Sequence, residues 1–319
     1  MATMLRAAKH DGVGNVVVER VEVPRPGEGE VLVRLEASLI SRGSEIGGRY
    51  LSETAVDPSR MGYSAAGVVA EAGPGVDDPR PGDRVVVGAP HAEYAIGRAS
   101  RPSVVPLPDE VGFEAATFLP LTTSSLAWAD SAMIGPRDDV VILGQGLVGS
   151  ILLQVVRQRE TGRLVAVDGL ERRCRLAARF ADDVVDCSRE DPVAAVQRLC
   201  PGGAQVVIDC VGGAAGVQSF AQAQQMCAAG GVIQLVGLYH RQPLPLDAGR
   251  VMGKLVVGGI RGEKPRGEYS RDAARFLAEG HLATGDMITH RFPLEEAKQA
   301  FDLLVDDLGS ALGVLFVYG

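Results

Sequence analysis

Hydrophobic and polar positions follow one pattern in the first part of the chain and another in the middle. The first part has short β-branched runs between Gly and Pro turns, at 15–20, 30–35, 67–71 and 83–87. Runs of this kind predict the short strands of a β-rich domain. From about 118 to 261, apolar runs alternate with helical segments, which predicts βαβ units and a parallel sheet.

Six apolar runs of the middle segment are predicted to be strands of one sheet. They lie at 140–143, 163–168, 184–186, 205–209, 231–237 and 254–260. After the first run, apolar residues recur at helical spacing from Leu147 to Val156, which predicts a helix packed on the sheet. An α/β fold with six parallel strands is typical of a Rossmann domain.

The tail is predicted to contain helices over 270–279 and 294–305 and a strand over 312–318. These elements are too few to fold alone, so we expect them to complete the first domain. The predicted domains are 1–117 with 262–319, and 118–261.

A glycine-rich loop, Gly144-Gln145-Gly146-Leu147-Val148-Gly149, joins the first predicted Rossmann strand to its helix. In this G-x-G-x-x-G pattern the first Gly permits a tight turn, the second lets the backbone approach a pyrophosphate, and the third lets helix and strand pack closely. The phosphates lie on free N–H groups at the helix start. The loop predicts a dinucleotide site.

An acidic residue, Asp168, ends the next predicted strand, 19 residues after Gly149. A carboxylate there accepts hydrogen bonds from ribose hydroxyls and repels a 2′-phosphate, which favours NAD(H) over NADP(H). Arg172 and Arg173 leave the alternative open, because they could contact a 2′-phosphate or form the solvated face of a helix over 171–179.

Composition excludes several classes of function. With 319 residues, 46% of them hydrophobic, the chain can bury substantial cores. A net charge of −8 argues against a nucleic acid partner. The start lacks a secretory apolar segment and no run is long enough to span a membrane, so we expect a cytoplasmic protein. The five cysteines contain no C-x-x-C pair, which argues against a disulfide framework.

Motifs along the whole chain resemble the medium-chain dehydrogenase/reductase superfamily, which contains the zinc alcohol dehydrogenases and quinone reductases. The matching stretches lie at 26–34, 62–76, 81–85, 92–94, 230–237 and 289–301, in addition to the glycine-rich loop. The resemblance implies a GroES-like catalytic domain built from both chain ends, a Rossmann domain between them, and a substrate cleft at their junction.

The zinc ligands of that superfamily are missing. Relatives with zinc have Cys where this chain has 39–45, and Gly-His-Glu where it has Gly62-Tyr63-Ser64. The third ligand falls within 119–125, which contains neither Cys nor Glu, and the four-cysteine lobe is absent. Because catalytic zinc needs three protein ligands, we expect none. His91 and Glu93, two apart on a predicted strand, are too few to bind a catalytic metal.

Hydrogen-bond donors must then stabilise the substrate oxygen. The resemblance places Tyr63 in the cleft as donor or general acid, although it could equally be a packed aromatic residue. Ser41, Arg42, Ser44 and Glu45 form a second polar group: Arg42 could bind a carbonyl or phosphate with Glu45 as its partner, or the segment could be a capped helix start.

Further residues are predicted near the cofactor. Ser125 resembles a hydroxyl residue near the nicotinamide in relatives, or is a helix-start hydroxyl. Cys210 and Gly237 follow the fourth and fifth Rossmann strands, where backbone contacts to a cofactor are expected. A basic group could form a rim for a coenzyme A thioester or be solvated: Arg241, Arg250, Arg261, Lys264 and Arg266.

Zinc-free members commonly reduce C=C bonds conjugated to a carbonyl, so the leading hypothesis is an NADH-dependent enoyl or quinone reductase with a small-molecule substrate. The alternatives are a metal-free alcohol or polyol dehydrogenase and a non-catalytic NAD(H)-binding protein. The resemblance also implies a homodimer formed through the strand at 254–260.

Overall fold

A six-stranded parallel sheet forms the centre of one of two compact units in this computed structural model, which describes residues 2–100, 103–240, 242–261 and 264–319. The unit comprises Ser124–Pro265. Its strands, in spatial order, are β10 (Asp183–Asp186), β9 (Leu164–Asp168), β8 (Val140–Leu143), β11 (Ala204–Asp209), β12 (Cys227–Leu235) and β13 (Leu255–Gly258). The order reverses between β8 and β11, which is the topological switch point of a Rossmann sheet.

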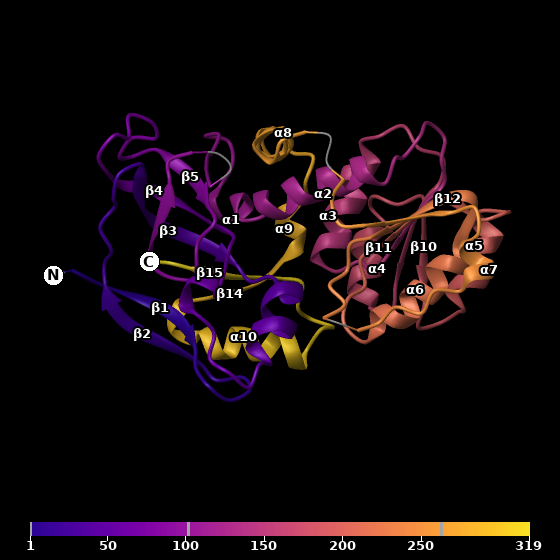
Figure 1. Cartoon of the computed structure of the whole chain (residues 1–319), viewed down its shortest axis with the longest axis horizontal. Coiled ribbons are helices and arrows are strands. Elements are labelled where there is room, and N and C mark those ends of the chain that lie inside the picture. Colours follow the sequence, from indigo (N-terminus) through magenta and orange to yellow (C-terminus); the bar gives the residue numbers. More distant parts are fainter. Residues whose placement is uncertain (1, 101–102, 241, 262–263) are drawn as a thin grey trace. The chain divides into compact units, whose positions relative to one another are not determined.

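Helices cover this sheet because its central strands are apolar on both faces. All four residues of β8 are buried. The helices of the unit are α3 (Leu147–Arg157), α4 (Glu171–Ala177), α5 (Pro192–Leu199), α6 (Ala215–Met226) and α7 (Ala248–Val251). Helix α3 packs beside α4, and α5 beside α6 (Figure 1). The predicted Rossmann domain is confirmed, although β12 begins four residues earlier than the apolar run at 231–237 indicated.

The other unit comprises Met1–Thr123 and Arg266–Gly319, so both chain ends contribute to it. Its main sheet has the order β14 (Ile288–Phe292), β15 (Gly313–Val317), β3 (Glu30–Leu39), β4 (Ala65–Ala72), β5 (Arg84–Val87) and β7 (Val104–Pro106), and β6 (Tyr94–Arg98) also pairs with β3. A separate hairpin contains β1 (Thr3–Lys9) and β2 (Val16–Glu22). The expected GroES-like, β-rich domain is confirmed.

Short helical segments complete this second unit. They are η1 (Arg42–Tyr50), η2 (Pro58–Arg60), α1 (Phe113–Ala116), α8 (Arg266–Ala278), α9 (Thr284–Met287), η3 (Leu294–Glu296) and α10 (Ala297–Asp306). The predicted helix over 294–305 is thus a 3₁₀ turn followed by an α-helix. Helix α2 (Leu119–Ser131) contains the boundary between the two units.

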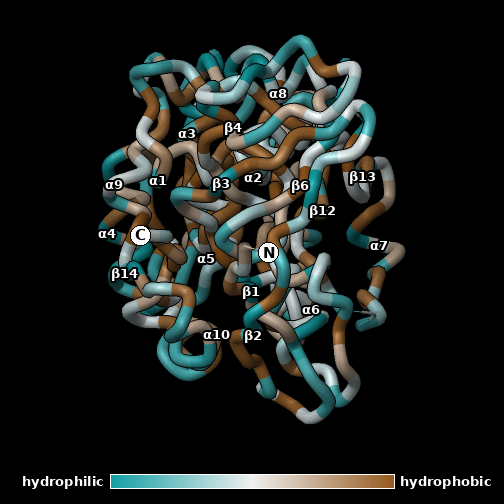
Figure 2. The backbone as a smooth tube through the Cα atoms, turned by 90° about the vertical axis from the view of Figure 1, so that its left-hand side faces the viewer, coloured by the Kyte–Doolittle hydropathy of each residue, from teal (hydrophilic) through white to brown (hydrophobic). Residues whose placement is uncertain are grey.

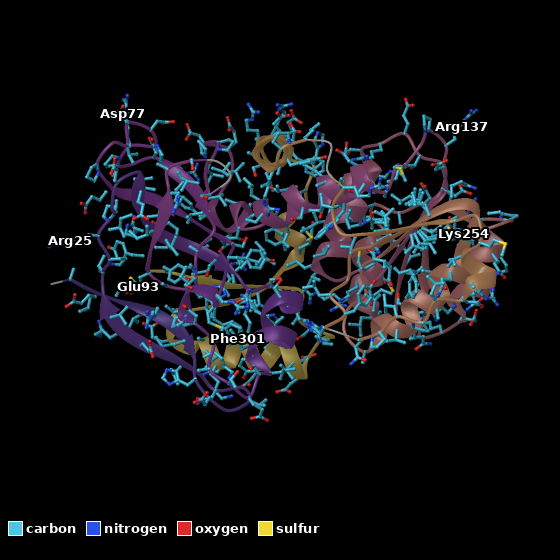
Figure 3. All side chains as sticks on the ribbon, viewed as in Figure 1. Arg25, Asp77, Glu93, Arg137, Lys254 and Phe301 are labelled. Atoms are coloured by element: carbon cyan, nitrogen blue, oxygen red, sulfur yellow. The ribbon has the colours of Figure 1, made fainter. Side chains whose placement is uncertain are left out.

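An aromatic cluster lies in the core that α10 shares with the sheet. Phe301 of α10, labelled in Figure 3, stacks on Tyr50 with ring centroids 5.2 Å apart and also packs against Phe316. All three are buried with apolar residues of β3, β4 and β5. In Figure 2 hydrophobic and hydrophilic stretches alternate along the backbone tube. Among the described residues, no helix combines the length and apolar character that a bilayer crossing requires.

Candidate functional site

The glycine-rich loop has the shape that its sequence predicts. Gly144 adopts a positive φ of 81°, in the left-handed region that favours glycine. A Cβ on Gly149 would lie 1.8 Å from the carbonyl oxygen of Gly144, so only glycine permits this approach of helix α3 to the loop. Gly146 is the N-cap of α3, and a Cβ there would meet nothing closer than Arg173 Nη1 at 3.8 Å. Space is therefore left above Gly146, at the end of the helix that attracts phosphate.

Asp168, at the end of β9, is bound to the same loop. Its Oδ2 accepts a hydrogen bond from Gln145 N at 2.6 Å, and its Oδ1 accepts one from Leu170 N at 2.9 Å. Arg173 Nη1 lies 3.7 Å from Oδ2. Arg173, rather than the exposed Arg172, is thus the arginine beside the predicted ribose-binding carboxylate.

Buried polar atoms without a partner gather at the predicted cofactor residues. Of the described side chains, four contain such an atom: Ser125 Oγ, Gln145 Oε1, Arg173 Nε and Gln234 Oε1. Three of them belong to residues predicted to bind cofactor. Buried polar groups are normally satisfied, and unsatisfied ones call for a missing partner. These residues fit a bound dinucleotide.

Ser125 differs from three other hydroxyl residues of its helix. Thr122, Thr123 and Ser131 each donate a hydrogen bond to the carbonyl four residues earlier, whereas Ser125 Oγ has no partner among the described residues. Ser125 is the seventh residue of α2, so its interpretation as a helix-start hydroxyl is wrong. A buried hydroxyl left available within a helix is consistent with the predicted contact to the nicotinamide.

The remaining predicted cofactor residues are held at the ends of β11 and β12. Cys210 packs against Gly149, and burial raises the pKa of its thiol well above the usual range. A Cβ on Gly237 would lie 2.3 Å from Val211 O, so the two strand ends approach closely. Because a protonated, buried thiol is a poor nucleophile, backbone contact is the role that fits this region.

Asp209, the last residue of β11, is a buried carboxyl that the sequence analysis did not single out. It accepts hydrogen bonds from Ser219 Oγ at 2.6 Å, Val211 N at 3.0 Å and Tyr239 Oη at 3.1 Å. Burial outweighs these three bonds and raises the pKa of Asp209 to about 6. Through the bonds from Ser219 and Tyr239, Asp209 connects helix α6 and the segment after β12 to the end of β11.

The raised pKa of Asp209 lowers the free energy of unfolding as pH rises, the reverse of the usual effect of an acidic residue. The ordinary pKa is 3.8 and the folded pKa about 6, so between these values the unfolded chain releases a proton that the folded chain retains. Stability from this group is therefore fully present below pH 4 and falls by about 3 kcal/mol as pH rises to 6 and above. About 2 kcal/mol of this loss falls between pH 4.5 and 7.5. We expect Asp209→Asn to remove it, measured as the difference in unfolding free energy between these two pH values.

Glu114→Gln is the matched control for Asp209→Asn. Hydrogen bonds from Arg291 lower the pKa of Glu114, so its contribution has the opposite sign and is lost as pH falls. An Asp209→Asn protein with the wild-type pH dependence would contradict the assignment.

The second group of predicted residues, in the other unit, gathers around Tyr63. Ser41 is the N-cap of η1, a nine-residue π-helix, although its hydroxyl makes no capping bond. The hydroxyls of Ser41 and Ser44 and the charge of Glu45 act on the Tyr63 phenol. Burial raises the pKa of Tyr63 above its ordinary value of 10, the two serine hydroxyls lower it, and Glu45 raises it further. Ser41, Ser44 and Glu45, which the sequence analysis placed in a second polar group, thus act on the Tyr63 phenol.

The pairing predicted in this cluster, Arg42 with Glu45, is wrong. Glu45 does not pair with Arg42: its Oε2 lies 2.9 Å from His91 Nε2, and both side chains are fully buried. Arg42 is exposed, and its Nε donates to the carbonyl oxygen of Leu304 at 3.1 Å. Within η1 the Glu45 carboxylate is buried and Arg42 is exposed, which charge alone could not indicate.

His91 and Glu93 do not face one another, and neither lies within a strand. They precede β6, and Glu93 Oε2 accepts a hydrogen bond from Leu5 N at 2.6 Å. His91 Nδ1 contacts Ser38 Oγ at 2.8 Å, and that hydroxyl contacts Tyr318 Oη at 2.7 Å. The sequence analysis missed Ser38 and Tyr318, which lie 280 positions apart and have no local motif.

The donor set around Tyr63 does not fit catalytic zinc. Both ring nitrogens of His91 and both carboxylate oxygens of Glu45 are already engaged. All five cysteines lie between 174 and 227, within the Rossmann unit. In the described part of the chain, no three or more His, Cys, Asp or Glu side chains form a group that could hold a metal ion. Zinc needs three such protein ligands and one open position.

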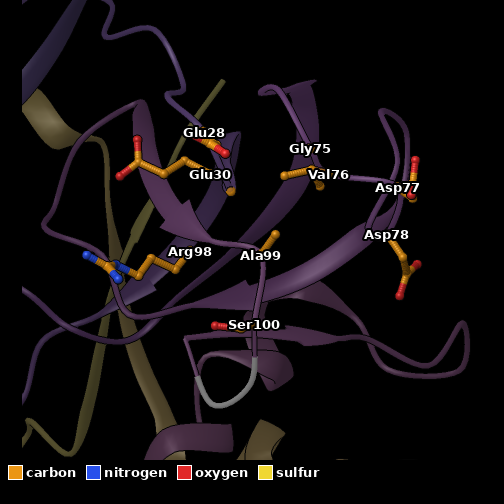
Figure 4. Close-up of a pocket in the computed structure, with 10 residues that line it drawn as sticks. Glu28, Glu30, Gly75, Val76, Asp77, Asp78, Arg98, Ala99 and Ser100 are labelled. Atoms are coloured by element: carbon orange, nitrogen blue, oxygen red, sulfur yellow. The ribbon is translucent and has the colours of Figure 1, made fainter.

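A surface cavity of about 430 Å³ lies away from these residues. Figure 4 shows it between the turns near Glu28 and Asp77 and the end of β6 at Arg98. Its acidic side chains include Glu30, which accepts a hydrogen bond from Gly27 N. None of the predicted site residues lines this cavity.

Of the residues predicted to form a basic rim, Arg241 lies outside the described residues. Arg250 forms an ion pair with Asp247 at 3.4 Å.

Known families and proteins are similar to the chain over most of its length. Residues 27–113 match the alcohol dehydrogenase GroES-like domain, and 148–279 match the zinc-binding dehydrogenase family. Sorbitol dehydrogenase of Pongo abelii is 26% identical over 93% of the chain and 92% of its own length. D-arabitol-phosphate dehydrogenase of Enterococcus avium is 28% identical over 90% of each.

A solved structure shares the fold of the whole chain. It is a putative zinc-binding dehydrogenase from Sinorhizobium meliloti bound to NADP, with a TM-score of 0.84, 24% identity, and coverage of 99% of this chain and 100% of that one. The two family matches account for the GroES-like sheet and the Rossmann sheet respectively. The chain therefore belongs to the medium-chain dehydrogenase/reductase superfamily of oxidoreductases.

Proposed function

We propose that this protein is a zinc-independent, NAD(P)(H)-dependent alcohol or polyol dehydrogenase, in which Tyr63 acts on the substrate oxygen. The observation that carries the proposal is the polar cluster of Tyr63, Ser41, Ser44 and Glu45, whose donor set does not fit zinc. The similarity to sorbitol and arabitol-phosphate dehydrogenases supports this alternative better than reduction of a conjugated C=C bond, the leading hypothesis from the sequence.

The Tyr63 phenol suits the reduction of a carbonyl. When bound, the nicotinamide cofactor supplies or accepts the hydride. Tyr63 donates a hydrogen bond and then its proton to the oxygen that gains negative charge, as a general acid does. Because burial raises the pKa of Tyr63, the phenol is protonated at neutral pH. Oxidation of an alcohol needs the phenolate as base, so we expect oxidation to accelerate up to and beyond pH 10.

Metal analysis joined to a substrate panel tests the proposal. The panel contains polyols, polyol phosphates, ketoses, enones, quinones and unsaturated coenzyme A thioesters, each assayed with NADH and NADPH or their oxidised forms. Turnover of polyols or ketoses by metal-free protein supports the proposal. Turnover that follows added zinc contradicts it, turnover of enones or thioesters alone restores the reductase hypothesis, and tight cofactor binding without turnover favours a non-catalytic protein.

NAD(H) remains our preferred cofactor because Asp168 faces the loop where the ribose is expected. The Arg173 guanidinium offers a charge-assisted contact to a 2′-phosphate, worth about 1.5–3 kcal/mol, or about 10- to 100-fold in affinity. We expect Arg173→Leu to lower kcat/KM for NADPH by that factor and to leave NADH use nearly unchanged. Exposed Arg172→Leu is the control. Equal losses with both cofactors would indicate that Arg173 contacts the pyrophosphate instead.

We also propose a homodimer formed by pairing of the edge strand β13 with its copy. Large apolar side chains near this edge are exposed, including Met252 at 80%, Leu255 and Ile260, and Figure 2 shows hydrophobic stretches between α7 and β13. We expect the wild type to sediment as a dimer and Leu255→Glu to sediment as a monomer, because like charges meet across the two-fold axis. Exposed Leu246→Glu should remain dimeric. A wild-type monomer at micromolar concentration would contradict the proposal.

A further inference from the structure

A second surface cavity, of about 390 Å³, lies within the Rossmann unit and is lined by none of the predicted site residues. A cavity of this volume can hold a small molecule. Its lining is dominated by charged side chains, which favours a charged ligand over an apolar one. These charged residues are Arg137, Arg157, Arg159, Glu160 and Asp182.

The cavity lies at the amino ends of the parallel strands. Arg137 belongs to the turn before β8, Gly162 to the turn before β9, and Asp182 directly precedes β10. The glycine-rich loop and Asp168 lie instead at the carboxyl ends of β8 and β9. The four residues of β8 span about 13 Å, so the whole strand separates this cavity from the predicted cofactor site.

The arginines of the cavity have more donors than the neighbouring acids occupy. Arg157 Nη1 lies 2.8 Å from Asp182 Oδ1, and Arg159 Nη2 lies 2.6 Å from Asp130 Oδ1. A guanidinium has five N–H donors, so each pair leaves donors on its arginine. The exposed Arg137 has no ion-pair or hydrogen-bond partner among the described side chains. Positive charge therefore remains available at the cavity.

The turn that carries Arg137 is held in place by its neighbours. Asp138 Oδ2 accepts a hydrogen bond from Gly135 N at 2.8 Å, and Asp138 O accepts one from Gly162 N at 2.9 Å. Arg137 has a φ of 70°, a left-handed conformation that is uncommon for arginine. Such a conformation persists where the surrounding structure imposes it. Figure 3 shows Arg137 projecting from this turn at the surface.

We propose that this cavity binds a small oxyanion, either a phosphate or a carboxylate, through the guanidinium groups of Arg137, Arg157 and Arg159. The planar guanidinium can form two parallel hydrogen bonds with either group. Glu160 is exposed, has no partner among the described residues and opposes an anion, so we expect a dissociation constant of about 1 mM. This site is separate from the cofactor site and does not depend on the proposed function.

The single tryptophan of the chain offers a direct test of binding. Trp128 precedes Ala129, whose carbonyl oxygen accepts a hydrogen bond from Arg159 Nη1 at 3.2 Å. We expect its fluorescence to change saturably when the full chain is titrated with inorganic phosphate or with malonate, at an ionic strength held constant with sodium chloride. Saturation by one probe alone identifies that group as the ligand. Saturation by neither, or the same response to chloride, would overturn the proposal.

Saturating NAD⁺ distinguishes this cavity from the cofactor site, where phosphate could also bind. We expect the dissociation constant of phosphate to be the same with and without NAD⁺. Displacement of phosphate by NAD⁺ would place the anion at the glycine-rich loop and would overturn the proposal. A protein that binds phosphate but turns over no substrate would reject the proposed function and leave this site standing.

Two substitutions of opposite charge test the assignment within the cavity. Arg137→Gln removes a charge-assisted contact, so phosphate should bind about 10- to 100-fold more weakly, with thermal unfolding unchanged because the side chain is exposed and unpaired. Glu160→Gln removes an opposing exposed charge, so phosphate should bind about two- to fivefold more tightly. Unchanged affinity in both variants would overturn the assignment.

Arg189→Gln is the matched control, because it removes the same charge from the same unit. The Arg189 side chain is 74% exposed and pairs with Asp186, the last residue of β10, at the carboxyl end of the sheet. Its affinity for phosphate should equal that of the wild type. An equal loss in Arg189→Gln and Arg137→Gln would show that phosphate responds only to the overall charge of the unit, and would overturn the proposed site.

Discussion

Tyr63→Phe is expected to lower kcat by about 10²- to 10⁴-fold, the usual contribution of a positioned general acid. The substitution removes only the hydroxyl, on which Ser41 and Ser44 act, and leaves the ring to pack as before. Because the predicted cofactor residues lie in the Rossmann unit, the dissociation constant of NADH should stay within about twofold. Steady-state kinetics in both directions and fluorescence titration of the cofactor measure the two quantities.

Tyr94→Phe provides the matched control, because Tyr94 lies on β6 of the same unit and no catalytic role is proposed for it. Its kcat should equal that of the wild type. Full turnover by Tyr63→Phe would show that another group donates to the substrate oxygen. Equal loss of kcat and of cofactor binding would show instead that the substitution disturbs the fold.

The Rossmann half was predictable because its signals are local. Apolar runs such as 140–143 form strands buried on both faces, and Gly144 and Gly149 meet steric demands that only glycine satisfies. The position of Asp168 follows from the same periodicity, since it ends the next parallel strand. The glycine pattern and the acidic residue are therefore sufficient, as a local sequence signal, to indicate a cofactor site.

The π-helix η1 was less accessible to prediction. Its sequence is polar and contains three glycines, so it resembles a loop with a capped start. The helix exists because Ile46 and Tyr50, four residues apart, both enter the aromatic core that contains Phe301. Such tertiary packing overrides local propensity and leaves no trace in the segment itself.

The partners of Glu45 were likewise hidden from the sequence. Arg42 stood three positions away with the opposite charge, yet the carboxylate pairs with His91, 46 positions distant. Burial decides the choice, because η1 places Glu45 in the core beside His91 while Arg42 stays at the surface. The positions of the missing zinc ligands could be identified from the sequence, because the ligand residues are absent from the motifs. The contacts of the residues that stand there instead are seen only in the folded structure.

Gly149→Ala and Gly146→Ala should separate the two demands that the glycine-rich loop meets. A Cβ on Gly149 would stand 1.8 Å from the backbone oxygen of Gly144, so helix α3 and the loop must move apart. We expect Gly149→Ala to destabilise the protein without cofactor by about 1–3 kcal/mol or more, as overpacking does, and to abolish measurable NADH binding. Chemical denaturation and cofactor titration measure both effects.

Gly146→Ala acts differently because its Cβ finds open space, with Arg173 Nη1 the nearest atom at 3.8 Å. Its φ of −64° is also open to alanine, so the protein without cofactor should keep its stability within about 0.5 kcal/mol. The added methyl group stands where a pyrophosphate must approach the backbone, so NADH affinity should fall at least about tenfold, a loss of about 1.4 kcal/mol. Undiminished binding by Gly146→Ala would place the dinucleotide elsewhere, whereas binding lost together with stability would mean that the loop, and not the ligand, needs the glycine.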